Sequence, residues 1–264
     1  MHVEVYPPAE LLKPFILTYL IIESEDKLVN NILPDTSLVM AFRYKGQMSY
    51  VANEVKNELP SSSLSGLRKS SRQFLYSKNT GNLLVLFKEG GAGAFFKTPL
   101  HQLFEACVSL EHFIDKSVLG KIEEQLSEAR TNTQRIKFLE MFLMAELRDL
   151  KSDPVIQVAL QKIHAARGLI RIKDLADGLC LSSDAFEKRF RRSIGTSPKQ
   201  FCSLVRIKSI TNGKLQNQNL AALALEAGYF DQAQFNKDFK LFTGQKPSVF
   251  FKSSPFLKIT DFLQ

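Results

Sequence analysis

The sequence of 264 residues has no tryptophan, only three cysteines and four histidines. The cysteines, Cys107, Cys180 and Cys202, are odd in number and far apart, which indicates reduced thiols and excludes a disulfide framework. The histidines form no metal-ligand spacing with them, so we expect no metal ion and no other cofactor. The apolar run Phe15–Ile22 is too short to cross a membrane and lacks the flanks of a signal peptide. These shortages predict a cytoplasmic protein without a membrane partner.

Catalytic patterns are also missing. No Ser, His and Asp set and no carboxylate pair stands out, so we predict that the protein is not an enzyme. The glycine-rich stretch 89–93 lacks the Gly-Lys-Ser/Thr ending of a phosphate loop and the third glycine of a dinucleotide fingerprint. We interpret it as a turn that leaves a strand, and the lining of a sensor pocket is the alternative.

The net charge of +8 is unevenly distributed. Residues 1–150 hold 17 Lys and Arg against 18 Asp and Glu, a net charge of −1. Residues 151–264 hold 18 against 9, a net charge of +9. A basic half of this kind is suited to attract phosphate groups, and no basic amphipathic stretch points to a lipid surface instead.

The basic half contains one pattern written twice. The first copy runs from Leu175 to Phe201 and the second from Leu223 to Phe250. From Leu181 and Phe230 onward, every matched position is 49 residues apart. A constant offset over a whole unit indicates a duplicated structural motif.

Local signals predict two helices in each copy. Ser182 and Asp231 are helix N-caps, and Gly195 and Gly244 end the helices that they open. Phenylalanines four residues apart give each of these helices an apolar face, as Phe186 with Phe190 and Phe235 with Phe239. Leu181 and Phe230 precede the caps and are expected to pack on the helices as hydrophobic staples. Shorter helices start near Ile172 and Leu220, so each copy predicts a helix-turn-helix motif.

The other face of each capped helix carries polar side chains that suit DNA. Amide and charged groups pair with base edges, whereas cations near helix ends suit phosphates. A merely solvated face is the alternative, which the repeat on a basic background disfavours. Between the copies, Pro198 opens a further helix towards Leu215, long enough to hold two reading helices near successive turns of the major groove.

The stretch from Leu175 to Phe250 resembles the DNA-binding region of AraC/XylS-type transcription regulators, which carry two helix-turn-helix motifs joined by a helix. The resemblance is most specific across the second motif, LALEAGYFDQAQFNKDFKLFTGQKPSVF. Cys180 departs from the pattern, since it stands at a turn position where the family usually has glycine. The resemblance implies a bacterial, sequence-specific DNA-binding protein. It places the base-reading positions at Asp184, Glu187, Lys188, Gln232, Ala233, Asn236 and Lys237. The phosphate-binding candidates are Ser183, Arg191, Arg192, Lys199, Lys240 and Lys246.

The N-terminal half predicts mainly strands, followed by helices. Phe15–Ile22, Leu38–Tyr44, Met48–Ala52 and Leu83–Lys88 have strand composition, and Pro60–Gly66 is expected to be a loop. Helices are expected at Leu100–Val108, Lys116–Ala129 and Thr133–Leu150. The apolar stripe of the last one predicts a helix packed on the sheet, with a dimer interface as the alternative; it comprises Ile136, Leu139, Phe142, Leu143, Leu147 and Leu150.

The fold class expected is α+β. Residues 1–152 should form a β-rich sensor-like domain that ends in helices, with a largely antiparallel sheet. Residues 153–264 should form an all-α DNA-binding domain, with Asp153-Pro154 near the junction.

The function expected is a transcription regulator that binds double-stranded DNA, controlled by a small-molecule effector or a partner acting on the N-terminal domain. A second copy of the chain, in a homodimer, and RNA polymerase are further possible partners. One alternative is a DNA-binding regulator without a small-molecule effector. Another is a DNA-repair enzyme with an AraC-like domain, for which no cysteine lies in an activating setting.

Overall fold

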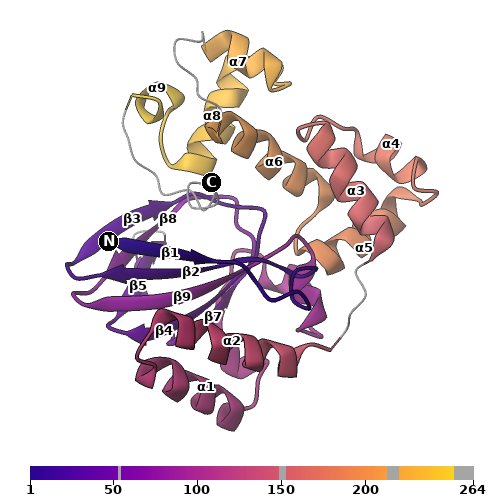
Figure 1. The fold of residues 1–264 in the computed structure, drawn as a ribbon. Coiled ribbons are helices and arrows are strands. Elements are labelled where there is room, and N and C mark those ends of the chain that lie inside the picture. The colour runs from indigo at the N-terminus through magenta and orange to yellow at the C-terminus, as the bar shows by residue number, and fades with distance from the viewer. Residues whose placement is uncertain (53–54, 149–152, 213–219, 253–264) are drawn as a thin grey trace.

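The computed structural model describes residues 1–52, 55–148, 153–212 and 220–252. A β-rich N-terminal domain is followed by a helical C-terminal domain, which lies against one end of the strands (Figure 1). The α+β fold class predicted from the sequence is therefore correct. The expected domain junction after residue 152 falls next to residues 149–152, which lie outside the described residues.

Two antiparallel sheets build the N-terminal domain. The six-stranded sheet has the order β1-β2-β9-β4-β7-β10. Its strands are β1 (His2–Tyr6), β2 (Ile16–Ser24), β4 (Val39–Lys45), β7 (Ser62–Ser65), β9 (Thr80–Phe87) and β10 (Cys107–Ser109). The four-stranded sheet has the order β3-β8-β5-β6. Its strands are β3 (Leu28–Ile32), β5 (Met48–Ala52), β6 (Val55–Glu58) and β8 (Arg72–Tyr76).

Helices cover one side of the larger sheet (Figure 1). They are α1 (Lys116–Glu128) and α2 (Asn132–Glu146), and three short 3-10 turns precede them, η1 (Gly91–Ala94), η2 (Leu100–Leu103) and η3 (Leu110–His112). Ile136, Leu139 and Leu143 of α2 are buried in the main core, and the ring of Phe142 meets that of Phe42 edge to face at 5.7 Å. The apolar stripe of α2 is thus packed on the sheet, as predicted, rather than left free for a partner chain. Leu150, its last expected member, lies outside the described residues.

Seven helices form the described part of the C-terminal half. They are α3 (Pro154–Ala165), α4 (Ile172–Asp177), α5 (Ser183–Ile194), α6 (Pro198–Asn212), α7 (Leu220–Glu226), α8 (Gln232–Thr243) and α9 (Pro247–Phe250). The pairs α4–α5 and α7–α8 are the two predicted helix-turn-helix motifs. Helix α6 joins them, and its 15 residues correspond to a length of about 22 Å. The expected extension of α6 towards Leu215 falls outside the described residues.

The hydrophobic interior is divided unequally between the two motifs. The main core runs without a break from the N-terminal sheet and α2 into the first motif, where it includes Phe186, Phe190 and Phe201. A separate cluster holds the second motif together around Phe235 and Phe239. The first motif therefore shares its core with the N-terminal domain, whereas the second has a core of its own.

The turns of the two motifs differ by one inserted residue. Leu181 N–H donates to Ala176 O in the first turn, and Tyr229 N–H donates to Ala224 O in the second. Tyr229 therefore corresponds to Leu181, and Phe230 is the additional residue. The ring of Tyr229 packs on that of Phe235 with centroids 5.4 Å apart, while Phe230 is 91% exposed. The expectation that Phe230 forms a hydrophobic staple was wrong, because the buried place is already taken by Tyr229.

Two other sequence predictions were wrong. Residues 60–66 are not a loop: β7 pairs with both β4 and β10, and Ser62, Ser63 and Leu64 are buried. Small hydroxyl side chains fit that interior, although their run resembles loop composition. The expected helix Leu100–Val108 is instead the short turn η2 followed by the edge strand β10. Glu105, with a left-handed φ of +62°, breaks the helical path between them.

No helix in the described ranges is long and apolar enough to cross a membrane. This finding agrees with the absence of a long apolar run in the sequence.

We predict that Phe235→Ala destabilises the protein by about 3–5 kcal/mol, because a fully buried aromatic side chain leaves a cavity. Phe230→Ala is the matched control, and it should leave the melting temperature nearly unchanged. Thermal unfolding followed by circular dichroism measures both variants. Equal melting temperatures of Phe235→Ala and the unaltered protein would contradict this packing.

Candidate nucleic-acid interface

The first candidate reading helix, α5, has a defined start and end. Its N-cap Ser182 accepts a hydrogen bond from Ala185 N–H at 3.3 Å. Gly195 ends the helix with a φ of +99°, a left-handed conformation that glycine adopts without strain. The turn before the helix contains Cys180, whose backbone φ is +58°. Residues other than glycine rarely adopt a positive φ. The family's glycine at this position is thus explained by backbone geometry, and this chain tolerates a cysteine there.

The second reading helix, α8, repeats this construction. Asp231 accepts from Gln234 N–H at 2.7 Å, and Gly244 ends the helix with a φ of +79°. The ring centroids of Phe235 and Phe239 lie 5.4 Å apart on the inner face, as those of Phe186 and Phe190 do at 5.6 Å in α5. Because the phenylalanines fix one face of each helix inward, the opposite face is turned to solvent.

The outer faces present most of the base-reading candidates. The side chains of Asp184, Glu187, Lys188, Gln232, Ala233 and Lys237 are exposed. Asn236 is only half-buried, and its Oδ1 is buried without a hydrogen-bond partner in the described structure. The structure therefore brings the candidates of each motif onto one helix face, with Asn236 at the inner edge of its face.

The phosphate-binding candidates are also on the surface. Ser183, Arg191, Arg192, Lys199, Lys240 and Lys246 are all exposed. Arg191 Nη1 lies 3.6 Å from Glu187 Oε1, so the two side chains form an ion pair along one face of α5. A phosphate-binding candidate is thereby paired with a base-reading candidate. Arg192 borders a cleft shared with the glycine-rich turn after β9, so part of its surroundings belongs to the N-terminal domain.

Sequence reasoning missed Arg189 of α5. Its guanidinium binds Asp153 at the start of α3 through two hydrogen bonds, Nε at 2.6 Å and Nη2 at 2.8 Å. Asp153 also caps α3 by accepting from Val155 and Ile156 N–H groups. Burial raises the pKa of this carboxyl, but Arg189 and the two amides outweigh that effect and hold the pKa below its usual value. The sequence indicated a domain junction near Asp153-Pro154. No sequence pattern indicated that Asp153 binds Arg189, which lies 36 residues further along the chain.

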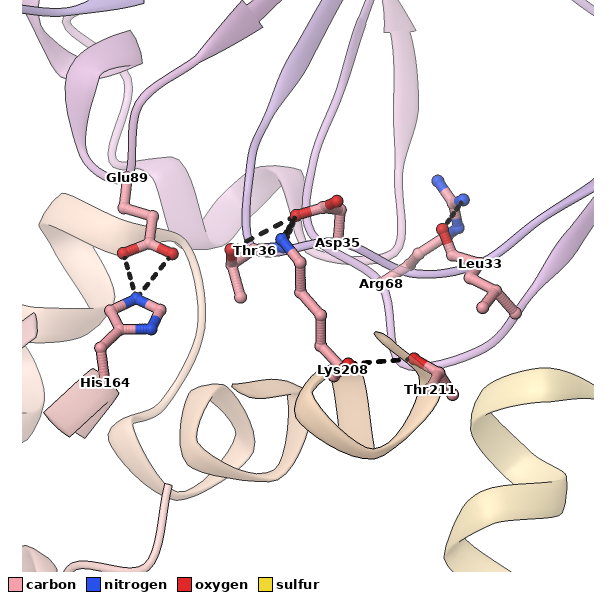
Figure 2. A network of polar contacts seen from close by, with 8 residues as sticks. All are labelled: Leu33, Asp35, Thr36, Arg68, Glu89, His164, Lys208 and Thr211. Atoms are coloured by element: carbon pink, nitrogen blue, oxygen red, sulfur yellow. Dashed lines mark hydrogen bonds and ion pairs between the residues drawn. The ribbon is translucent and has the colours of Figure 1, made fainter. Parts of the chain in front are cut away.

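The second motif is tied to the N-terminal domain at three places. Leu33, in the loop after β3, is buried in the core of the second motif beside Ile207 and Ile210. Two residues on, Asp35 pairs with Lys208 Nζ of α6 at 2.5 Å (Figure 2). Ser71 N–H also donates to Phe242 O at the end of α8 at 2.9 Å. Both the linking helix α6 and helix α8 therefore contact loops of the N-terminal domain.

The first motif is tied to the N-terminal domain by packing, and the neighbouring helix α3 adds a polar contact. The 3-10 turn η2 packs against α5, and Ile194 belongs to the main core. His164 Nε2 of α3 lies 2.8 and 3.0 Å from the two carboxylate oxygens of Glu89, in the turn after β9 (Figure 2). The contacts of both motifs fix the positions of α5 and α8 relative to one another.

The cysteines show no arrangement typical of catalysis. Cys107 lies on the edge strand β10 and is half-buried, which corrects its expected place on an apolar helix. Cys202 is buried in α6, and burial raises the pKa of its thiol to about 11. Cys180 is exposed. Within the described ranges, no group of three or more His, Cys, Asp or Glu could hold a metal ion.

Comparisons with known proteins agree with this geometry. Residues 175–253 match a family model described as a helix-turn-helix domain, and residues 4–109 match a domain of unknown function. The Msm operon regulatory protein of Streptococcus mutans is 28% identical over 158 residues, which are 57% of this chain and 55% of that protein. The chain thus matches only about half the length of this curated relative.

Two solved structures are similar in fold. ToxT from Vibrio cholerae is 15% identical with a TM-score of 0.42, over 95% of this chain and 97% of that one. A probable AraC family transcriptional regulator from Rhodopseudomonas palustris is 26% identical with a TM-score of 0.34, over 38% of this chain and 96% of that one.

The fold and the two exposed, capped helices define a protein with a duplicated helix-turn-helix domain. Residues 175–253 match the helix-turn-helix model, and this match agrees with the resemblance found in the same stretch of the sequence. The curated relative is named as a regulatory protein.

We predict that the Asp153–Arg189 pair stabilises the protein above about pH 4, because the ordinary pKa of Asp is about 3.9 and the folded value is lower. The contribution should be lost as the pH falls through the folded pKa. Asp153→Asn keeps the helix cap but removes the charge. Its melting temperature should lie below that of the unaltered protein at pH 7, and the gap should narrow towards pH 3. Asp184→Asn, at an exposed site, is the control, and a gap for Asp153→Asn that persists at pH 3 would contradict the prediction.

Proposed function

We propose that the protein is a sequence-specific DNA-binding transcription regulator of the cytoplasm, in which α5 and α8 each enter a major groove. The observation that carries this proposal is the pair of capped helices whose inner faces are fixed by phenylalanines and whose outer faces are polar and exposed. A helix with a polar outer face fits the major groove, where base edges present distinct donors and acceptors. The AraC-type domain and the regulator name of the curated relative support the same function.

We assign base reading to Asp184, Glu187 and Lys188 in the first motif and to Gln232, Ala233, Asn236 and Lys237 in the second. Lys suits guanine, Asn and Gln suit adenine, and the carboxylates suit the amino group of cytosine. Ser183, Arg191, Arg192, Lys199, Lys240 and Lys246 would contact phosphates and set the register. The net charge of +9 on residues 151–264 supports this division, since phosphate contacts supply most of the affinity that does not depend on sequence.

The linking helix supports reading of two adjacent groove segments by one chain. Helix α6 is about 22 Å long with its 15 residues, and α5 and α8 lie near its two ends (Figure 1). The widths of α5 and α8 add to the length of α6, so the separation of the two helices approaches the ~34 Å between successive turns of the major groove. Dimerisation is then not required for binding, although a homodimer would lengthen the operator.

We further propose that residues 1–152 regulate residues 153–264, through a ligand or a partner protein such as RNA polymerase. The contacts of Leu33, Asp35 and Ser71 with the second motif support this arrangement. Since the first motif shares its core with the N-terminal domain, a change in that domain alters how the second motif is held relative to the first. Regulation by abundance alone, without a small-molecule effector, is the alternative, and effector titrations of DNA binding decide between them.

We predict that Lys188→Ala and Asn236→Ala each weaken binding to the preferred DNA sequence by about 1–3 kcal/mol, the usual contribution of one base contact. Lys240→Ala should weaken all sequences about equally and reduce the salt dependence. Lys162→Ala, an exposed lysine of α3 outside both faces, is the matched control. Fluorescence anisotropy with the selected sequence and a scrambled duplex measures each effect.

The first experiment is a selection of bound fragments from random-sequence DNA by the full chain, followed by salt titration of the winners. A steep decrease of affinity with salt together with an enriched motif supports the proposal. Salt-dependent binding without any enriched motif would reduce the protein to a non-specific DNA binder. If the variants at positions 188 and 236 bind the enriched motif as tightly as the unaltered chain, the assigned reading faces are incorrect.

A further inference from the structure

One aromatic ring of the second motif is exposed to water. Phe230 is 91% exposed, and the next most exposed large apolar side chain among the described residues is Leu225 at 67%. The ring adds nothing to the core, because Tyr229 fills the buried place beside Phe235. Single exposed apolar side chains are common on protein surfaces, so the position of Phe230 in the motif decides what its exposure means.

Phe230 lies at the N-terminal end of α8. In the first motif the N-cap Ser182 follows Leu181 directly, whereas in the second Phe230 stands between Tyr229 and the N-cap Asp231. The extra residue is thus an aromatic one placed immediately before the start of the helix. In helix-turn-helix proteins the N-terminal residues of the second helix contact base edges. Phe230 therefore lies where α8 meets the bases when it enters the major groove.

The backbone of Phe230 is held on both sides. Before it, Tyr229 N–H donates to Ala224 O at 2.9 Å, and the Tyr229 ring is buried. After it, Asp231 accepts a hydrogen bond from Gln234 N–H at 2.7 Å. Ordering a flexible segment costs free energy on binding, and a segment that is already ordered avoids most of that cost. The exposed ring is thus presented by a turn of defined geometry.

The major groove offers one kind of apolar partner to such a ring. Base edges present hydrogen-bond donors and acceptors there, and the 5-methyl group of thymine is the apolar group among them. Apolar contact by phenylalanine or alanine is a usual way of recognising that methyl group. Ala233, in the first turn of α8, is also exposed and presents a methyl group. The exposed Lys237 and Lys240 favour an anionic partner such as DNA over an uncharged protein surface.

We propose that Phe230 is a specificity-determining residue whose ring contacts the 5-methyl group of a thymine in the groove segment entered by α8. This inference rests on the function proposed above and adds a residue that neither the repeat nor the charge of the motif indicated. The contact buries the ring and the methyl group together, which removes apolar surface from water. Cytosine has no methyl group at that position, so the contact favours a T·A pair over a C·G pair.

Uracil substitution in the bound DNA tests the contact directly. Uracil lacks the 5-methyl group of thymine but forms the same base pair, so the substitution removes only the proposed partner of Phe230. Fluorescence anisotropy compares binding of the full chain to the enriched duplex with binding to duplexes in which each thymine is replaced by uracil in turn. We expect at least one thymine whose replacement weakens binding by about fourfold, the factor that burial of one methyl-sized group supplies.

The variant Phe230→Ala assigns that thymine to the ring. It should bind the enriched duplex at least about fourfold more weakly, and the uracil penalty at one position should disappear. Its affinity for a scrambled duplex should stay the same, because the phosphate contacts are unchanged. Phe230→Ser provides a second, polar replacement with the same expected result. Leu241→Ala is the matched control, since Leu241 is an apolar residue of α8 that is 51% exposed but lies in the last turn. This control should leave both the affinity and the uracil penalties unchanged.

Four results would overturn the thymine contact. An enriched motif that binds equally well in all its uracil forms, or uracil penalties that all persist in Phe230→Ala and Phe230→Ser, would reject it and leave the proposed function standing. Equal weakening of the enriched and scrambled duplexes by Phe230→Ala would place the ring on the DNA backbone instead. Unaltered affinity of Phe230→Ala for the enriched duplex would indicate that the ring serves a protein partner. The absence of any enriched motif would reject the proposed function together with this contact.

Discussion

The continuous hydrophobic core is the constraint on which the rest of the structure depends. It runs from the larger sheet through α2 and into the first helix-turn-helix motif, so that Phe186 and Phe190 pack in the same interior as Phe42 and Phe87. Since burial of apolar surface is the main term that stabilises a fold, the first motif cannot separate from the N-terminal domain without exposing this interior. The position of α5 is therefore fixed by the N-terminal domain.

The second motif is attached to the N-terminal domain differently. Its phenylalanines form a separate cluster, to which Leu33 is the contribution of the N-terminal domain among the described residues. Further ties in the described part of the chain are the ion pair of Asp35 with Lys208 and the backbone hydrogen bond from Ser71. A few contacts of this kind can be exchanged at modest cost, whereas a shared core cannot.

Errors in the sequence interpretation have physical causes that are visible at particular residues. Ser62 and Ser63 resemble a loop, yet they are buried because β7 is flanked by strands on both sides. Phe230 was expected to pack on α8, but one inserted residue in the turn gives that place to Tyr229. The helix predicted near Leu100 is interrupted where Glu105 takes a left-handed conformation. In each case a contact from a distant segment, or one extra residue, outweighs the local preference.

The sequence by itself determined the two helix-turn-helix motifs. Caps, terminal glycines and phenylalanine spacing act within a few residues, and a fixed offset of 49 repeats them. It also determined the uneven charge and, through the exposed faces of the repeated helices, the candidate reading residues. Only the tertiary structure decided how the strands divide into two sheets, that Arg189 binds Asp153, and that Leu33 enters the core of the second motif. Those contacts join residues far apart along the chain, and no local pattern encodes which distant partner an arginine or a leucine will meet.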